Sequence, residues 1–505
     1  WHNAPSEIQR SLFEHFHELL TDSSEAEKNR RLLRQLQMVN KLLLLLQDSS
    51  LVSGTVKAIA NVLGVLLQGV PHPPALLIFG QFLASTLPSV DEKSITPQEL
   101  QEWSTCESEP SLKSWKDSDS MSEDSTALVS AHTVCLRNTL LETLLRILHY
   151  VNSGSISVPT CDEVQRVLGF DWLLLFLQGH LHPTTAIIAL RILIAMLSNQ
   201  TTINKFREGQ SGGGWLDQTE PVLHNRMKVV LGFNVGKSSK KPQTREINQE
   251  ACLLPGFLML PTLLPRHADV PEIYFLLIAL ALGHPPKPLP DNCQLDLNSM
   301  WQYIFGVPAS QSASGTLSTN LCPDAVMILL SQVRVMLNQA YDDEDEKTSW
   351  LQEYPVTLVQ FLLYLYHNVT EFKPICMSGP FLCGLASTLF PYPTTHGDQM
   401  TTIQEENTLL LDDMGDLASP LDDIQYLPDL DIPGLGLKID NGTSQANLTG
   451  HPAKRYVMDF IRVIVVDSLS LPMPNRSPTV LDIILESSPE RATPCQINEF
   501  QTAIL

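Results

Sequence analysis

Three histidines recur in similar surroundings and are the first candidates for metal chemistry. His72 and His182 each end the phrase Leu-Gln-Gly-x-x-His-Pro, and His284 lies in the looser Leu-Gly-His-Pro-Pro. Neither a cysteine nor a carboxylate stands beside them at the spacing of a metal ligand. Glycine can close a helix in the left-handed conformation, and proline can start the next helix. The phrase therefore predicts bends between antiparallel helices, with the histidines as local capping groups.

A phosphate-binding loop is suggested by Gly232-Phe-Asn-Val-Gly236-Lys237-Ser238, which follows an apolar run. The loop that wraps phosphates needs four residues between its glycines, so that successive backbone N–H groups surround the anion. This sequence has three, and the residues after Ser238 predict no helix whose dipole could help. We interpret the segment as a solvated basic loop.

Other catalytic patterns are missing from the sequence. His15 and His17 would point to different faces of a helix, and no third ligand accompanies them, so we expect them to be surface residues. The Gly-x-Ser-x-Gly, His-Glu-x-x-His and Gly-x-Gly-x-x-Gly motifs do not occur. We therefore expect a protein that is not an enzyme and that has no cofactor and no metal.

The charge balance limits the class of partner. The net charge is −22, whereas nucleic acid and anionic lipid both require clustered lysine and arginine. Much of the acidity lies in Asp117–Asp124, Asp342–Glu346 and Glu405–Asp440, which we interpret as solvated loops. Proteins are therefore the expected partners, and nucleic acid is not.

Cysteines and apolar runs bear on the cellular compartment. The nine cysteines include no Cys-x-x-Cys pair, and Cys135 and Cys252 lie in apolar helical context, which favours reduced core residues and the cytosol. No apolar run reaches the roughly 18 to 20 residues of a membrane-spanning helix. The chain begins with Trp1 and stops inside an apolar pattern, so we expect a piece of a longer protein.

Apolar residues recur at helical spacing along most of the chain. Amphipathic stripes occupy 8–20 and 32–46, while 52–67, 75–87 and 187–197 are apolar on all sides, as interior helices are. Further helices are predicted at 134–150, 162–177, 252–264, 270–282, 323–340, 354–368 and 380–389. Residues 453–471 contain a Val463–Val466 run that could be a strand, but the helical period and the lack of a partner strand favour a helix.

These segments predict an all-α, armadillo/HEAT-like helical-repeat solenoid with long disordered acidic loops. The phrases that contain His72 and His182 lie about two repeats of roughly 33 to 47 residues apart if the acidic segment between them is not counted. This spacing suggests that the phrase has a fixed place in the repeat. We place helical repeats at 1–90, 131–208, 251–390 and 451–505. The connecting segments are an acidic, Ser-rich loop at 91–130, a Gly/Lys-rich loop at 209–250 and an acidic loop at 391–450.

Two of these loops contain candidate functional residues. The Gly/Lys-rich loop holds a basic group that could contact anionic lipid: Lys228, Lys237, Lys240 and Lys241. The Ser-rich loop holds serines in acidic context that could be phosphorylated: Ser118, Ser120, Ser122 and Ser125. An unregulated, solvated linker is an equally good interpretation of the second group.

Four stretches resemble one family. They are PGFLMLPTLLPRHADVPEIYFLLIAL (255–280), EYPVTLVQFLLYLYHN (353–368), HPAKRYVMDFIRVIVVDSLSL (451–471), and ESSPER with EFQTAIL near the end. They are similar to the region upstream of the BEACH domain in the very large BEACH-family WD-repeat and FYVE-domain-containing proteins. The resemblance is strongest in the second half of the chain.

The resemblance implies an armadillo-like scaffold that acts in vesicle trafficking. It further implies autophagy-related or endosomal cargo handling, possibly antigen processing, and a cytoplasmic protein peripherally associated with endosomes or autophagic structures. Membrane association would be indirect, through family modules outside this sequence, so no site residue of theirs transfers to a position here. The alternative is a peripheral membrane-surface module that binds anionic lipid through the basic loop.

Overall fold

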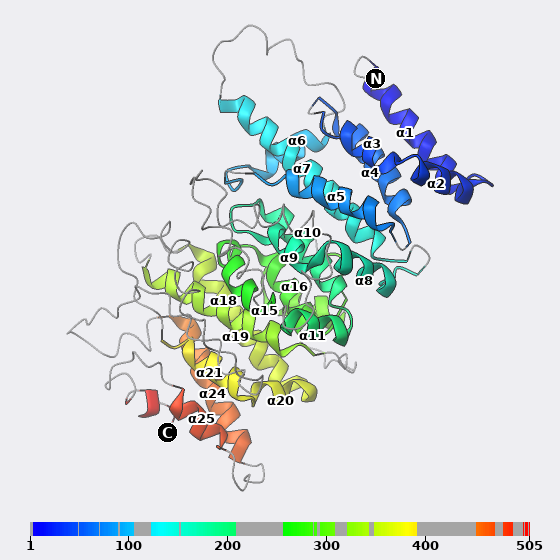
Figure 1. Cartoon of the computed structure of the whole chain (residues 1–505). Coiled ribbons are helices and arrows are strands. Elements are labelled where there is room, and N and C mark those ends of the chain that lie inside the picture. Colours follow the sequence, from blue (N-terminus) through cyan, green and yellow to red (C-terminus); the bar gives the residue numbers. More distant parts are fainter. Residues whose placement is uncertain are drawn as a thin grey trace, which may run out of the picture. The chain divides into compact units, whose positions relative to one another are not determined.

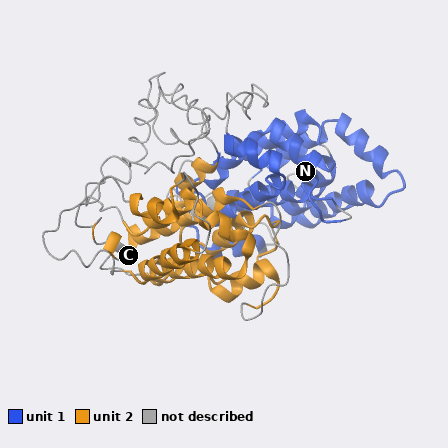
Figure 2. Ribbon diagram, turned by 90° about the horizontal axis from the view of Figure 1, so that it is seen from below, with its two compact units in different colours: residues 1–256 blue, residues 257–505 orange. Residues whose placement is uncertain are grey.

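The computed structural model describes residues 4–48, 50–69, 71–88, 91–105, 123–150, 153–208, 256–285, 287–289, 293–308, 321–342, 348–390, 451–469, 478–487, 498, 500–502 and 504. Contacts divide the chain into two compact units, Trp1–Gly256 and Phe257–Leu505, drawn in separate colours in Figure 2. Each unit is a stack of helices, labelled in Figure 1.

Unit 1 contains the helices of the first half of the sequence. They are α1 (Ser6–Thr21), α2 (Ala26–Gln35), α3 (Met38–Leu45), α4 (Ser53–Leu67), α5 (Pro73–Ser85), α6 (Pro97–Thr105), α7 (Glu123–Ile147), α8 (Val158–Val167), α9 (Gly169–Leu174), η2 (Leu175–Leu177), α10 (Pro183–Met196) and α11 (Gln200–Glu208).

The helices of unit 1 form two rows. In the first, which we call the A row, α1 packs on α4, α4 on α7, and α7 on α10. In the second, the B row, α3 packs on α5 and α5 on α8, and each B-row helix also packs on the A-row helix that follows it. Most side chains of α4 and α10 are buried, because each of these helices packs against neighbours on several sides.

Unit 2 repeats this two-row pattern. Its elements are α15 (Gly256–Leu263), η3 (Pro265–His267), α16 (Pro271–Ala281), α17 (Leu297–Phe305), α18 (Pro323–Asp342), α19 (Ser349–Asn368), η4 (Thr370–Phe372), α20 (Lys373–Cys376), α21 (Gly379–Ser387), α24 (Pro452–Leu469) and α25 (Val480–Glu486). Helices α16, α18, α21 and α25 pack in sequence as one row, and α17, α19 and α24 as the other.

The all-α prediction is confirmed. The described residues contain one isolated β-bridge, between His149 and Ile156, and otherwise no β-structure. In each unit, each helix of a row packs on the next helix of that row, and this arrangement is compatible with a helical-repeat solenoid. Residues 453–469 of the predicted segment 453–471 are helical, as part of α24, so the Val463–Val466 run is not a strand. Residues 391–450 and 209–250 lie outside the described residues.

The prediction of one loop over 91–130 is wrong at both ends. Helix α6 lies inside this range, and α7 begins at Glu123. Ile95 belongs to a buried cluster with Ala131 and Val134 of α7, and Leu100 packs against it. These few apolar residues are surrounded in the sequence by acidic and hydroxyl residues. Their burial packs the segment against α7. Residues 106–122 are outside the described part of the chain.

Two predicted helices are interrupted. The helix expected at 162–177 is divided into α8, α9 and η2, with Gly169 at φ +83° at the break. The helix expected at 32–46 is divided into α2 and α3 at Gln37, whose φ is +52°. Both breaks need a left-handed residue inside an apolar pattern, and hydrophobic spacing alone does not reveal such a residue.

The His-Pro phrases do form bends, but not at one place in the repeat. The first phrase leads out of the A row, from α4 to α5, whereas the second leads into it, from η2 to α10. Gly69 and Gly283 are left-handed, with φ of +85° and +68°, whereas Gly179 is not among the glycines with positive φ. The phrase encodes the end of one helix and the start of another, and this chemistry suits a bend in either direction.

Within the described part of the chain, no single helix is long and apolar enough to cross a bilayer. The pair α10 and α11 satisfies the length and composition criteria only when joined, and it is bent by 117° between them.

Candidate functional site

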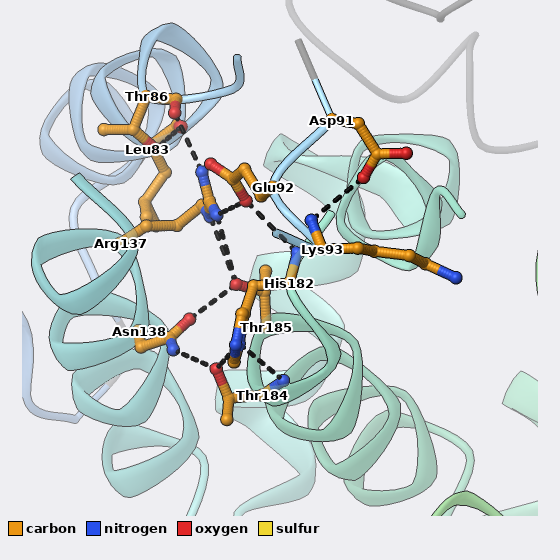
Figure 3. Close-up of polar contacts among 10 residues, drawn as sticks. All are labelled: Leu83, Thr86, Asp91, Glu92, Lys93, Arg137, Asn138, His182, Thr184 and Thr185. Atoms are coloured by element: carbon orange, nitrogen blue, oxygen red, sulfur yellow. Dashed lines mark hydrogen bonds and ion pairs between the residues drawn. The ribbon is translucent and has the colours of Figure 1, made fainter. Parts of the chain in front are cut away.

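The most concentrated polar chemistry in unit 1 is a buried cluster around Arg137, shown in Figure 3. We call it the Arg137 cluster, and its members are Thr86, Glu92, Arg137, Asn138, His182, Thr184 and Thr185. They come from the end of α5, the segment before α6, the middle of α7 and the start of α10. The side chain of Arg137 is fully buried, and that of Glu92 is 3% exposed.

The guanidinium of Arg137 donates hydrogen bonds to acceptors from three segments of the chain. Nη2 forms an ion pair with Glu92 Oε2, and Nη1 donates to the carbonyl of Thr86 at 2.9 Å. Nη2 and Nε donate to Thr185 Oγ1 at 3.2 and 3.3 Å. A planar fork of donors suits such a site because several acceptors are reached without reorientation.

Glu92 fixes the segment before α6 to the start of α10. The Glu92 carboxylate accepts a hydrogen bond from the backbone N–H of His182 at 3.2 Å. The backbone N–H of Glu92 donates to the carbonyl of His180 at 2.9 Å. The carboxylate therefore receives both a charged and a backbone donor, which is what a buried anion requires.

A chain of smaller groups completes the cluster. Thr185 Oγ1 donates to Asn138 Oδ1, and Asn138 Nδ2 donates to Thr184 Oγ1, both at 2.7 Å. His182 Nδ1 lies 2.7 Å from Thr184 Oγ1 and accepts from the backbone N–H of Thr184, so this histidine caps α10 as predicted. Burial lowers the pKa of His182, with Glu92 opposing, so its neutral form is favoured.

The arrangement holds helices together and presents no reactive group to solvent. The charged pair is enclosed, and the hydroxyl groups of Thr184 and Thr185 are engaged in hydrogen bonds within the cluster. Breaking a buried pair of this kind leaves an uncompensated charge, at a cost of about 3–5 kcal/mol. The chemistry of the Arg137 cluster is therefore structural, since it sets how α5, α7 and α10 meet.

The other histidines of the repeated phrase behave differently. His72 is the N-cap residue of α5, without a side-chain capping bond. His284 closes α16 through its backbone N–H, which donates to the carbonyl of Ala279 at 2.8 Å. The described residues contain no group of three or more His, Cys, Asp or Glu that could hold a metal ion. His15 is exposed, as expected, and lies 3.6 Å from Glu18.

All but one of the sequence-predicted site residues lie outside the described residues. The basic-loop lysines, Lys228, Lys237, Lys240 and Lys241, lie outside the described residues, as do Ser118, Ser120 and Ser122. Ser125 falls in the first turn of α7. Cys135 is a free, partly buried thiol whose pKa burial raises to about 11, while Cys252 lies outside the described residues.

Sequence reasoning missed the Arg137 cluster. One signal was available, because Arg137 shares a helical face with Leu140, Leu141 and Leu144, which are buried. A lone charge on an apolar face indicates a buried partner. Nothing in the sequence marked Glu92, among many acidic residues, as that partner.

The chain is similar to WD repeat- and FYVE domain-containing protein 4 of Homo sapiens, with 27% identity over 507 residues, and of Mus musculus, with 27% over 511 residues. Each alignment covers 100% of this chain and 14% of the relative, so the chain spans about a seventh of their length. The family resemblance indicated by the four stretches is thereby confirmed.

No protein-family model matches the chain, and no solved structure matches it significantly.

Proposed function

We propose that this chain is a non-enzymatic, armadillo-like scaffold segment of a large BEACH-type protein that acts in endosomal vesicle trafficking. The observation that carries the proposal is the similarity to WD repeat- and FYVE domain-containing protein 4 along the whole chain. The two-row packing of each unit supports it, because stacked repeats bury helices against their neighbours and leave extended faces free.

In this proposal the chain presents helical surface and acidic loops to protein partners. Autophagy-related cargo handling and antigen processing are the finer roles that the family resemblance suggests. The protein would be cytoplasmic and peripherally associated with endosomes or autophagic structures, and modules elsewhere in the protein would make the membrane contact. The enclosed Arg137 cluster fits this role, since its polar groups serve the packing of helices.

Proximity labelling in cells tests the proposal. The full-length protein and a version lacking these 505 residues would each carry the same labelling enzyme at the same terminus. We expect a set of endosomal or autophagic proteins to be labelled only when the segment is present. A matched variant with Arg137→Ala, which loosens unit 1, should lose part of that set. An identical set of labelled proteins with and without the segment would refute the scaffold role.

The alternative is a membrane-surface module that uses Lys228, Lys237, Lys240 and Lys241. Liposome sedimentation separates the two functions, because electrostatic binding to anionic lipid weakens with salt and with the removal of each lysine. Salt-sensitive binding that disappears when these four lysines are neutralised would favour the alternative. The scaffold proposal predicts no difference between the chain and this variant.

A further inference from the structure

Helices α4, α7 and α10 of the A row each leave one narrow stripe of side chains accessible. These helices have neighbours on most sides, so most of their residues are buried. The residues that are not buried recur every three or four positions, which places them along one side of each helix. They are Gly54, Lys57, Asn61 and Gly64 on α4, Cys135, Asn138, Thr139, Glu142 and Arg146 on the second half of α7, and Pro183, Thr184, Ile187 and Arg191 on α10.

Two hydrogen bonds join these stripes into one surface, which we call the A-row face. Arg146 Nη1 of α7 donates to Asn61 Oδ1 of α4 at 3.0 Å. On the other side of α7, Asn138 Nδ2 donates to Thr184 Oγ1 of α10 at 2.7 Å, as Figure 3 shows. The A-row face therefore extends across three neighbouring helices of unit 1.

Arg146 and Arg191 lie at similar heights on the A-row face. Helices α7 and α10 run in the same direction, because both end beside the start of α8. The N-cap of α8 is bonded to the last residues of α7, and Cys161 Sγ of α8 lies 3.9 Å from the carbonyl of Ala195 on α10. Each arginine follows its helix's member of the second hydrogen bond by about two turns. Because the axes of packed helices are about 8–10 Å apart, the two arginines stand on neighbouring helices at about that spacing.

The A-row face carries an excess of positive charge. Its cations are Lys57, Arg146 and Arg191, whereas Glu142 is its one acidic residue. Helix α6 borders the face, where the carbonyl of Ser104 lies 3.5 Å from Lys57 Nζ. This charge balance contrasts with the net charge of −22 of the chain. An anionic partner is therefore favoured at this surface.

The two arginines of the A-row face are not paired with carboxylates in the described part of unit 1. The side chain of Arg191 makes no hydrogen bond or ion pair with the described residues, and its Nε is enclosed without an acceptor. A guanidinium has five N–H donors, and donors left without acceptors in a half-buried position cost free energy. Arg146 donates to neutral groups, Asn61 and Thr143. Both guanidinium groups are therefore available to bind a carboxylate.

We infer that the A-row face binds an extended, acidic segment of a partner protein. The inference rests on the proposed scaffold function and adds to it the face and the chemistry of the partner. Residues of an extended chain rise by about 3.3 Å each, so carboxylates three residues apart are about 10 Å apart. Neighbouring row helices have about the same spacing, so one carboxylate reaches Arg146 and the next reaches Arg191. Lys57 binds a further carboxylate on α4.

Nucleic acid and anionic membranes fit this face less well. Both are bound by larger groups of cations, typically about four to eight lysines or arginines for a lipid surface. The A-row face has Glu142 among its few cations. A short row of separate carboxylates can avoid this residue, whereas a continuous anionic surface cannot.

Fluorescence anisotropy with the 505-residue chain tests the inference. The probe is a labelled peptide of about twelve residues, with glutamate at every third position and glycine or serine between. We expect binding that weakens as salt is added. Arg191→Gln should weaken it by about tenfold and Arg146→Gln by about threefold, because Arg191 is the less exposed. Glu142→Gln should strengthen it by about twofold, since it removes the one repulsive charge.

Arg166→Gln is the matched control. It removes the same charge from α8 in the B row, where Arg166 pairs with Glu163 at 2.6 Å, so the affinity should not change. Equal weakening by all three arginine variants, or no binding of the peptide, would overturn the inference. Equal binding of a peptide of the same composition with contiguous glutamates would also overturn it, because such binding ignores the helix spacing. Circular dichroism would confirm that the variants keep their helices.

The same experiment separates a partner from an acidic segment of this chain. Residues 106–122 follow α6 directly and contain Glu107, Glu109, Asp117 and Asp119. Peptide binding that does not change when a neutral linker of equal length replaces these residues would support a partner. Peptide binding that appears only after the replacement would assign the face to the chain's own segment and overturn the inference.

Proximity labelling separates failure of this inference from failure of the scaffold function. The full-length protein with Arg146→Gln and Arg191→Gln together should lose part of the set of labelled proteins that depends on these 505 residues. An unchanged set would overturn the A-row face as the binding surface and leave the scaffold function intact. A set that is unaffected by removal of all 505 residues would instead refute the scaffold function itself.

Discussion

Aromatic rings join neighbouring helices in both units, such as Phe170 of α9 with Phe206 of α11 in unit 1, but unit 1 also uses a buried guanidinium for this purpose. Arg137 of α7 contacts Thr185 of α10 and the carbonyl of Thr86 beyond α5. In unit 2 the ring of Trp301 on α17 lies 4.7 Å from that of Tyr364 on α19, and Tyr366 lies 5.7 Å from Phe460 on α24. The two-row pattern of helices therefore does not require one particular kind of contact.

The difference matters because the two kinds of contact tolerate change differently. A buried ion pair must keep every partner, since an unpaired charge is costly. Aromatic contacts depend mainly on buried area, and their edge-to-face geometry adds only about 0.5–1.5 kcal/mol. The polar groups that link helices in unit 2, such as Tyr366 with Asp467 at 3.0 Å, involve a carboxylate that is 40% exposed. We therefore expect unit 1 to be the more sensitive to loss of single polar groups.

The largest effect is expected for Arg137→Ala. The substitution leaves Glu92 buried without its cation, so unit 1 should lose about 3–5 kcal/mol of stability. Hydrogen exchange resolved by peptide would measure this, with protection lost in α7 and α10 and retained in α16 to α19. The double variant Arg137→Met with Glu92→Leu removes both charges and should recover most of the loss. Equal losses in the single and double variants would show that packing, and not charge, joins these helices.

Asp171→Asn should have a somewhat smaller effect, in the stabilising direction. Asp171 is buried on α9, and burial raises the pKa of its carboxyl to about 7. In the unfolded chain the group titrates near its ordinary value of about 3.9. Its contribution to stability is therefore full below that value and is lost as the pH rises toward 7.

The asparagine variant lacks this titration and should be more stable by about 2–4 kcal/mol at neutral pH. Urea unfolding from pH 4 to pH 8 would measure the difference between the two proteins. A difference that stays constant across this range would contradict the assigned pKa.

Two matched hydroxyl deletions compare the units directly. Thr185→Val, in unit 1, is expected to cause the larger loss of stability. Thr185 is fully buried, accepts from Arg137 and donates to Asn138. Replacing its hydroxyl with a methyl group leaves those partners unsatisfied, so a loss of about 1–3 kcal/mol is expected. Peptide-resolved hydrogen exchange would locate the loss in α7 and α10.

Tyr366→Phe, in unit 2, is expected to cause the smaller loss of stability. The tyrosine hydroxyl donates to Asp467, which is also 3.6 Å from Lys373 and open to solvent. Water can replace the hydroxyl, so the loss should be below about 1 kcal/mol. Urea unfolding of this variant beside Thr185→Val would decide the comparison. A larger loss in unit 2 than in unit 1 would reverse our assignment of the more sensitive unit.

Much of the fold could be predicted from hydrophobic spacing. Helices α16, α18, α21 and α24 occur within a few residues of their predicted bounds. Their apolar residues alone specify both the helix and its burial. The short helices α6 and α17 were not predicted. Each is nine residues long and follows a polar segment, so too few turns exist for a period to show.

The Arg137 cluster could be predicted only in part. His182 as a cap followed from the proline and glycine around it, and the cap is present. The pairing of Arg137 with Glu92 depends on two residues 45 positions apart in the chain. Such a pairing follows from how the rows of helices pack, which local sequence patterns do not encode.

The Arg137 cluster also bears on how unit 1 folds. Elsewhere in the rows each helix contacts only near neighbours, so repeats can form and open one at a time. The cluster spans α5, the segment before α6, α7 and α10, and the departure of any of these removes at least one hydrogen-bond or ion-pair partner of the buried Arg137–Glu92 pair. This stretch should therefore open as one cooperative block.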